Sequence, residues 1–235
     1  MHTTKRKVEI SDIGKNGSMR MSALLDFMQD IDFSHLQSEP ALSEFFSDKR
    51  NVMFLVSRQA DIIRLPEYGE ELTVSTWCYE LKRMYGYRNT VITDSRGEAC
   101  VRAYEVGAFA ELPSQRPVKI EQEVADRVEK HDKLDMEYTS RKITLPDREP
   151  DRVCELKIYD SFIDMYGHVN NARYTELAED FLPNGREVSR LRAEYKTPLK
   201  MENASARAWL DENAITVEIM NAEGRSCCVL EYILA

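Results

Sequence analysis

A short segment in the last third of the chain brings together side chains that could do chemistry. It reads Asp164-Met-Tyr-Gly-His168-Val-Asn-Asn171. An aspartate can act as a general base or a nucleophile, and a histidine can orient water, donate to an oxyanion or carry a proton. The two asparagines open a predicted helix, whose unpaired N–H groups and positive dipole end can hold a carbonyl oxygen as charge develops on it. Together these groups are suited to attack on a carbonyl carbon.

Two further residues of the segment are candidate supporting groups. Tyr166 can donate its phenol to a reacting oxygen, and Gly167 allows close approach of the backbone at the turn. Taken alone, Asp164 and Asn170 would be interpreted first as helix caps, and His168 as a structural histidine. The catalytic interpretation therefore depends on the elements that position the segment.

The composition is that of an ordinary globular protein, with 235 residues, 43% hydrophobic and 31% charged. A net charge of −9 argues against nucleic acid as the principal partner. No apolar run approaches the roughly 20 residues of a membrane span, and no apolar segment follows the first residues as in a secretory signal. The five cysteines contain no C-x-x-C pair, which fits a reduced compartment. We therefore expect a cytoplasmic protein with no membrane span.

The chain contains two copies of one pattern. In each copy a proline precedes a tryptophan by eleven residues, as Pro66 to Trp77 and Pro198 to Trp209. A turn between two strand patterns follows each tryptophan, at 94–97 and at 221–224. Helical spacing of apolar residues precedes each proline, at 21–36 and at 170–181, and a short strand precedes each helix, at 7–10 and at 155–159. Each copy therefore predicts a strand, a helix and several antiparallel strands.

In the hotdog arrangement, a strand leads into a central helix and an antiparallel sheet wraps around that helix. The predicted fold is therefore α+β, a tandem (double) hotdog. We expect an N-terminal hotdog domain at 1–111, a polar linker with one exposed helix at 112–150, and a C-terminal hotdog domain at 151–235. The first copy has extra residues at 37–50, which predict a lid or a longer helix. No G-x-S-x-G elbow, phosphate loop or H-E-x-x-H spacing is present, which sets those enzyme classes aside.

With these elements in order, the chain resembles the acyl-acyl-carrier-protein thioesterases, the bacterial relatives of the plant enzymes, over nearly its whole length. The blocks that carry the resemblance are Ser11-Asp12, Asn16-Gly17, Leu24-Leu-Asp-Phe-Met-Gln-Asp30, Phe54-Leu-Val-Ser-Arg58, Arg64-Leu-Pro66, Gly69-Glu70, Thr76-Trp77 and Asp164-Met-Tyr-Gly-His-Val-Asn-Asn-Ala-Arg-Tyr174. The last block is similar to the active-site signature of that family. The resemblance implies hydrolysis of fatty acyl thioesters on acyl carrier protein, as part of fatty acid biosynthesis, with no metal or organic cofactor.

Asp164 and His168 match catalytic positions of the family pattern. The chemistry of the helix start adds Asn170 to the expected catalytic residues, with Tyr166, Gly167 and Asn171 as possible support. The family pattern is not followed everywhere. It differs from this chain at two places: Tyr166 stands where asparagine is usual, and Pro198 where a downstream carboxylate is usual. Glu194 and Glu202 lie near Pro198 but out of register. In a double hotdog the acyl chain usually lies against the first helix and sheet. The expected tunnel residues are Leu24, Phe27, Met28, Phe54 and Trp77, each of which could equally be plain core.

Three questions stay open at this level. An acyl-CoA thioesterase with the same site, or an acyl-binding double hotdog with weakened catalysis, would share most of these features. Because one chain supplies both hotdogs, a monomer is favoured over a homodimer. Finally, the sequence predicts either a basic patch for an acidic protein partner or a solvated face, formed by Arg58, Arg64, Lys82, Arg83 and Arg88. Asp30 and Asp32 are expected to be solvated helix charges.

Overall fold

The computed structural model describes residues 1–48, 50–112, 114–183 and 185–235. Within these residues ten strands form one antiparallel sheet in the order β1-β3-β4-β5-β2-β7-β10-β9-β8-β6. In chain order, the strands of the first half are β1 (His2–Lys7), β2 (Asn51–Ile62), β3 (Glu71–Lys82), β4 (Tyr85–Thr93) and β5 (Ala99–Glu111). Those of the second half are β6 (Arg152–Leu156), β7 (Val188–Tyr195), β8 (Ala204–Leu210), β9 (Ala214–Asn221) and β10 (Ser226–Leu234).

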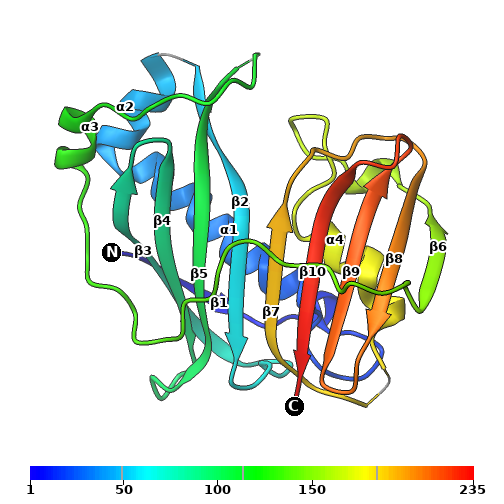
Figure 1. Ribbon diagram of the computed structural model, residues 1–235. Helices are drawn as coiled ribbons and strands as arrows, with labels where there is room; N and C mark the ends of the chain where they lie inside the picture. The colour runs from blue at the N-terminus through cyan, green and yellow to red at the C-terminus, as the bar shows by residue number, and fades with distance from the viewer. Residues whose placement is uncertain (49, 113, 184) are drawn as a thin grey trace.

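The sheet consists of two halves with the same connectivity. Reading from each outer edge inward, β1-β3-β4-β5-β2 corresponds to β6-β8-β9-β10-β7. The halves join where β2 pairs with β7, in a register that places Ser57 opposite Glu194 and Asp61 opposite Arg190. The helices α1 (Met21–Ser38) and α4 (Arg173–Ala178) lie behind the sheet in Figure 1, one to each half. The predicted duplication is therefore present in the fold.

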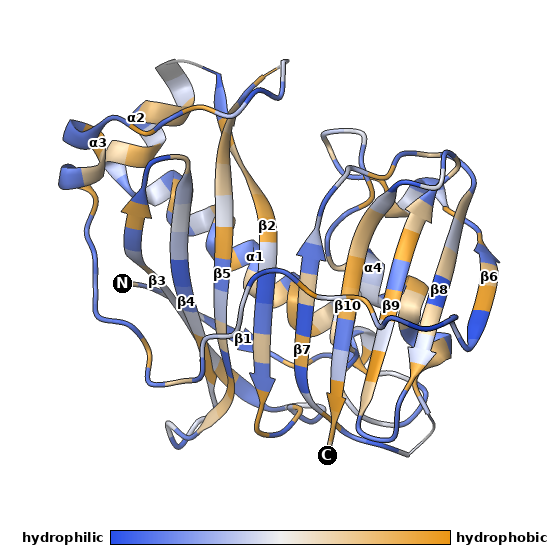
Figure 2. Cartoon of the chain, viewed as in Figure 1, coloured by the Kyte–Doolittle hydropathy of each residue, from blue (hydrophilic) through white to orange (hydrophobic). Residues whose placement is uncertain are grey.

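The first helix follows its apolar spacing. Leu24, Leu25, Met28 and Ile31 are at most 1% exposed and pack on the sheet, so the helix predicted at 21–36 is confirmed and extends to Ser38. Figure 2 shows hydrophilic and hydrophobic bands alternating along the strands that face it. The extra residues of the first half form a second helix, α2 (Pro40–Asp48). Residue 49, in the stretch predicted as a lid or longer helix, lies outside the described residues.

Two predictions of local structure were wrong in their bounds. The strands predicted at 7–10 and 155–159 are found at His2–Lys7 and Arg152–Leu156. Both are edge strands with no buried side chain. The apolar residues that suggested them, Val8 and Ile158, are buried just beyond the strand ends. The second helix is also shorter than predicted, because the chain makes a turn at 170–172 before α4 begins and continues as a 3₁₀ turn at Glu179–Phe181.

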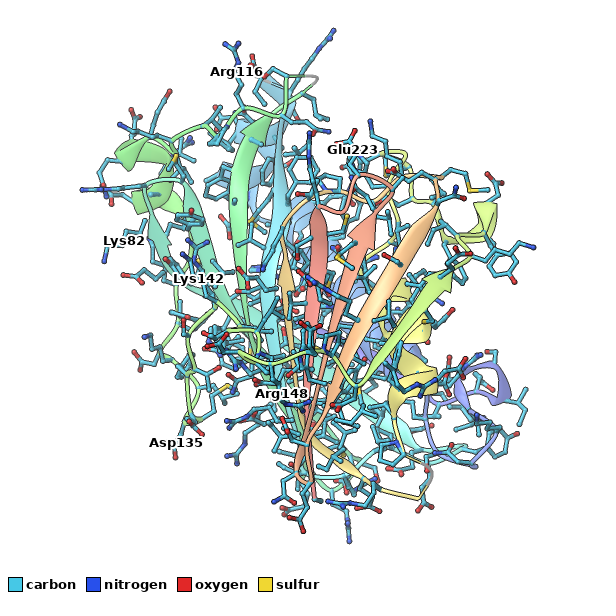
Figure 3. The ribbon with its side chains drawn as sticks, turned by 45° about the vertical axis from the view of Figure 1, so that its right-hand side comes forward. Lys82, Arg116, Asp135, Lys142, Arg148 and Glu223 are labelled. Atoms are coloured by element: carbon cyan, nitrogen blue, oxygen red, sulfur yellow. The ribbon has the colours of Figure 1, made fainter. Side chains whose placement is uncertain are left out.

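The segment between the halves crosses the outer face of the sheet. After α3 (Gln122–Arg127) it runs in front of the strands of both halves in Figure 1, and Figure 3 labels Asp135, Lys142 and Arg148 along it. Each half fixes it through its tryptophan: the indole N–H of Trp77 donates to the carbonyl of Asp132, and that of Trp209 to the carbonyl of Arg148, each at 2.8 Å. The repeated tryptophans therefore hold the linker. Pro113, part of the predicted linker, lies outside the described residues.

In the part of the chain that the structure describes, no helix is both long and apolar enough to cross a membrane.

Candidate active site

The segment singled out in the sequence forms a closed loop before α4. The backbone N–H of Asp164 donates to the carbonyl of His168 at 2.7 Å, and the N–H of Gly167 donates back to the carbonyl of Asp164 at 3.0 Å. An isolated bridge between Ile163 and Val169 closes the base of the loop. Asp164 and His168 therefore occupy fixed positions on the backbone of one tight turn.

The side chain of Asp164 also stabilises this turn. Its Oδ1 accepts the backbone N–H of Tyr166 at 2.8 Å and that of His168 at 3.2 Å. A carboxylate has about four acceptor positions on two oxygens, so Oδ2 keeps its capacity for another partner. Asn170 behaves in the same way, since its Oδ1 accepts the N–H of Ala172 at 2.9 Å, and its amide N–H₂ group remains a donor. Each residue can thus cap the loop and still present a polar atom.

Gly167 owes its place to backbone conformation. Its φ is +79°, in the left-handed region that favours glycine, and a Cβ built there would meet no atom within 4 Å. No side chain or backbone of the described residues therefore comes close enough to Gly167 to exclude a Cβ. The turn simply needs a residue that adopts a positive φ without strain.

The same loop occurs in the first half, 150 residues earlier. Gly14 donates to the carbonyl of Ser18 at 2.8 Å, Gly17 donates to Gly14 at 3.0 Å, and φ of Gly17 is +82°. Gly14 stands where Asp164 stands in the second loop, and Ser18 where His168 stands. The fold has duplicated the backbone of the loop, and only the second copy carries the carboxylate and the imidazole.

A cavity of about 860 Å³ lies inside the first half and reaches the loop of the second. Its wall includes five residues of the predicted segment: Asp164, Met165, Tyr166, Asn170 and Asn171. The ring of Tyr166 packs edge-on against Phe54 of β2, with 6.0 Å between ring centroids, and Phe54 also lines the cavity. The structure thus brings the polar loop of one half to the hollow of the other. The side chain of His168 is half-buried and does not line this cavity.

Of the five expected tunnel residues, Phe54 lines this cavity and the other four do not. Leu24, Phe27 and Met28 belong to the packed core below the cavity, and Trp77 holds the linker on the outer face. The apolar wall comes instead from the end of α1, from α2 and from facing strand residues. Its members are Phe33, Leu36, Leu42, Phe46, Val52, Met53, Leu55, Leu81 and Phe109. The helical spacing of apolar residues in α1 indicates which residues face the sheet. It does not distinguish those that line the cavity from those that pack against other side chains.

Four charged side chains form a group on the cavity wall that the sequence did not reveal. Arg58 of β2 and Glu105 of β5 form a buried ion pair, and each residue is 2% exposed. Arg88 of β4 binds Asp32 of α1 at 2.9 Å, and Asp32 lies 3.5 Å from Arg58. The expectations of a basic patch or solvated face for Arg58 and Arg88, and of a solvated charge for Asp32, were therefore wrong. We call these four residues the ionic cluster.

Burial and pairing have opposite effects on the two carboxyl groups of the ionic cluster. Burial raises the pKa of Glu105 well above its usual value, although Arg58 opposes that change. Burial also disfavours the charged form of Asp32. The Arg88 guanidinium, a hydrogen bond with the carboxyl group of Glu105 and the Arg58 guanidinium outweigh burial and lower the pKa of Asp32. In the sequence, the ionic cluster is visible only as three charged residues inside predicted strands, Arg58, Arg88 and Glu105, each next to apolar or uncharged residues.

The downstream position that lacks a carboxylate lies beside the loop. The N–H of Val169 donates to the carbonyl of Leu199 at 2.8 Å, and Pro198, the preceding residue, is exposed. Glu194 points to the other face of the sheet, where its Oε2 accepts the N–H of Ile143 in the linker. Glu194 is therefore not a substitute for the usual carboxylate.

A sheet of two like halves, each wrapped around a central helix and joined where β2 pairs with β7, defines a double hotdog protein. Here a polar loop of one hotdog borders the cavity of the other. Residues 1–128 match the model of the acyl-ACP thioesterase N-terminal domain, and the chain belongs to this family.

Comparisons with individual proteins agree with this assignment. A chloroplastic acyl-[acyl-carrier-protein] hydrolase of Cuphea viscosissima is 25% identical over 180 residues; the match covers 69% of this chain and 42% of the length of that relative. The fold matches an acyl-ACP thioesterase from Bacteroides thetaiotaomicron with a TM-score of 0.88 at 21% identity, over 99% of this chain and 97% of the other. It also matches a 12:0-ACP thioesterase from Umbellularia californica with a TM-score of 0.86 at 16% identity, over 99% of this chain and 96% of the other.

Proposed function

We propose that the protein hydrolyses the thioester between a fatty acyl chain and acyl carrier protein, releasing the free fatty acid in fatty acid biosynthesis. The observation that carries this proposal is the cavity that runs from an apolar wall in the first half to Asp164 and Asn170 in the second. Its volume, about 860 Å³, is within the range of roughly 300–1,000 Å³ typical of sites for small apolar ligands. An acyl chain in this hollow would place its thioester at the polar loop.

Asp164 is the group best placed to begin the reaction. Its carboxylate lines the cavity and is oriented by two backbone N–H groups at Oδ1, which leaves Oδ2 for a water molecule or for direct attack on the carbonyl carbon. As a base it would take a proton from water; as a nucleophile it would form an anhydride that water then opens. Both routes end in the free acid and the thiol.

The developing oxyanion needs a donor, and the departing thiolate needs a proton. Asn170 lines the cavity, and its amide N–H₂ group is the candidate donor, worth about 10²–10³ in rate for groups of this kind. His168 sits in the same closed turn as Asp164, and we assign it the proton transfer. A thiol with a pKa near 8.5 leaves readily, so this demand is modest. Tyr166, on Phe54, can add a phenol donor.

We propose the same division along the chain as in the sequence. Residues 1–111 form the acyl-binding hotdog, 112–150 the linker and 151–235 the hotdog that carries the catalytic residues. The substrate partner is acyl carrier protein through its phosphopantetheine arm. The protein acts as a monomer, without metal or organic cofactor.

A hydrolysis panel tests the proposal. Acyl carrier proteins loaded with chains of graded length are incubated with the parent protein and with Asp164→Ala, His168→Ala and Ser18→Ala variants. We expect the first two substitutions to abolish most of the hydrolysis, and Ser18→Ala, the matched change in the non-catalytic loop, to preserve it. Full activity in Asp164→Ala and His168→Ala would show that the mechanism is wrong. Tyr166→Phe, which keeps the ring on Phe54, separates the phenol from the packing: an unchanged rate would remove the phenol from catalysis.

Two other functions share this fold and are separated by the same panel. A strong preference for acyl-CoA over acyl carrier protein in direct competition would make the protein an acyl-CoA thioesterase. The exposed Pro198 beside the loop is the observation that favours an acyl-binding protein with weakened catalysis. That function requires lipid to co-purify with the protein and hydrolysis to be absent at every chain length.

A further inference from the structure

The middle of α1 carries three polar side chains at neighbouring positions, Asp26, Gln29 and Asp30. Asp26 binds Arg173 of α4, and Asp30 binds Arg6 of β1. Among the described residues, no group forms a hydrogen bond or an ion pair with the side chain of Gln29. Gln29 is half-buried and lines the cavity. Its amide is therefore a polar group of the cavity wall that is free to bind a ligand.

The ion pair between Asp26 and Arg173 holds this part of α1 against the element that follows the catalytic loop. Gln29 follows Asp26 by three residues, and residues three apart lie on the same side of a helix. Asn170 precedes Arg173 by three residues, and its backbone carbonyl accepts the N–H of Arg173 at 2.9 Å. Three residues of helix span about 4.5 Å. Gln29 and Asn170 therefore lie close to the same ion pair, and both line the cavity.

The backbone N–H groups around the reactive side chains already have acceptors. Those of Tyr166 and His168 donate to Oδ1 of Asp164, and that of Ala172 donates to Oδ1 of Asn170. The N–H groups of Asp164 and Asn170 donate to backbone carbonyls. None of these five backbone groups is available to a thioester oxygen, which favours side-chain amides as the donors at this end of the cavity.

We propose that Gln29 is a further catalytic residue, whose amide N–H₂ group donates to the thioester carbonyl oxygen together with that of Asn170. This inference rests on the proposed function and adds a residue of the first half to its oxyanion site. Attack on the carbonyl carbon moves an electron pair onto the carbonyl oxygen, and the pair returns when the C–S bond breaks. A carbonyl oxygen has two lone pairs, so it accepts from two donors at once. Both donors are neutral, so they stabilise the developing charge without neutralising the carboxylate of Asp164.

The Gln29→Met variant tests this role, with kcat and KM measured separately on acyl carrier protein substrates. Methionine is a good helix former of similar length and has no N–H donor. We expect kcat to fall about 10²-fold with KM within about threefold of the parent, because the donor acts on charge that develops in the transition state. Tm should stay within about 2 °C, since the substitution removes no hydrogen bond. An unchanged kcat, or a rise in KM alone, would overturn the assignment.

The Gln29→Glu variant adds a pH dependence that a purely structural role would not produce. A carboxylate has no proton to donate and repels a developing oxyanion, whereas a protonated carboxyl group donates through its O–H. Because the ordinary pKa of a glutamate is about 4.3, the ratio of variant to parent kcat should rise about tenfold or more as the pH falls from 8 to 5. A ratio that is independent of pH would count against the proposal.

Glu179→Met is the matched control in the second half. Glu179 stands 150 residues after Gln29, is exposed and does not line the cavity. We expect its kcat to stay within about twofold of the parent. Equal losses in Glu179→Met and Gln29→Met would overturn the assignment to Gln29. If the parent hydrolyses acyl carrier protein substrates and Gln29→Met does so equally well, this inference fails and the thioesterase function stands. If the parent hydrolyses none of them, the proposed function itself fails.

Discussion

Gly167→Ala and Gly17→Ala form a matched pair of substitutions that separates the stability of a loop from its chemistry. Both glycines have φ near +80°, and both lie in a turn closed by the same backbone hydrogen bonds. A Cβ at either position would meet no atom within 4 Å, so the cost of each substitution is that of the left-handed conformation alone. That cost is about 1 kcal/mol for alanine. We expect both variants to lose the same stability.

The two substitutions should differ in catalysis. An alanine that relaxes its φ moves the backbone N–H groups of the turn. In the second loop these N–H groups orient the carboxylate of Asp164, whereas the matching residue of the first loop, Gly14, has no side chain to orient. A displacement of about 1 Å in a catalytic group can cost about 10²-fold in rate. We therefore expect Gly167→Ala to reduce kcat/KM by one to two orders of magnitude, and Gly17→Ala to leave it within about twofold of the parent.

Thermal unfolding and hydrolysis of acyl carrier protein substrates measure the two quantities. For a chain of this size about 1 kcal/mol corresponds to a fall of about 2–4 °C in Tm, expected in both variants. Equal losses of activity in the two variants would refute the reasoning, because the first loop carries no carboxylate or imidazole. Full activity of Gly167→Ala would show that the orientation of Asp164 does not depend on this turn.

Three more substitutions test other parts of the structure. Asp164→Asn keeps the Oδ1 acceptor of the turn and removes the charge, so kcat should fall about 10³-fold or more in single-turnover assays while Tm stays within about 2 °C. Gly107→Ala places a Cβ 2.6 Å from the side chain of Met53 and drives it into the cavity, so the chain-length optimum in the hydrolysis panel should shorten by roughly one or two methylenes. Burial, with Arg88 and His2 nearby, lowers the pKa of His35 to about 3. The unfolded chain therefore binds more protons between pH 3 and 6.5. Urea titrations should then show parental stability falling on the order of 2 kcal/mol between pH 7 and 5, and His35→Leu should lose most of that slope.

The sequence predicted the fold well where burial leaves a periodic trace. The first helix was confirmed because its apolar face recurs at helical spacing, and the duplication because a proline and a tryptophan mark the same strand in each half. The edge strands were misplaced because a strand that buries no side chain fully has no apolar alternation to detect. Burial patterns report what packs, and an edge strand is held mainly by backbone hydrogen bonds.

For the site, sequence could identify reactive residues but not what surrounds them. The loop with Asp164 and His168 was visible because those residue types are close together in the chain. The cavity wall was not, since it is assembled from α1, α2 and four strands. Arg58 and Glu105 are 47 residues apart, and their pairing depends on the register of β2 with β5. A charged residue inside a predicted strand indicates only that one face of the sheet is polar there, or that an oppositely charged residue lies on the neighbouring strand.

The duplication explains why the catalytic loop and the cavity belong to different halves. In the second half the interior is filled. Tyr174 of α4 packs edge-on against Tyr195 of β7, with 5.8 Å between ring centroids, and Tyr232 of β10 is fully buried in the same core. In the first half α2 follows α1, and the space between α2, the C-terminal end of α1 and the facing strands stays hollow. A reactive loop over the filled half would have no room for an acyl chain beneath it. The contact between Tyr166 and Phe54 instead directs the second loop to the first hollow. Substitutions at Phe54 should therefore alter chain selection and catalysis together, whereas changes in the interior of the second half should act on stability.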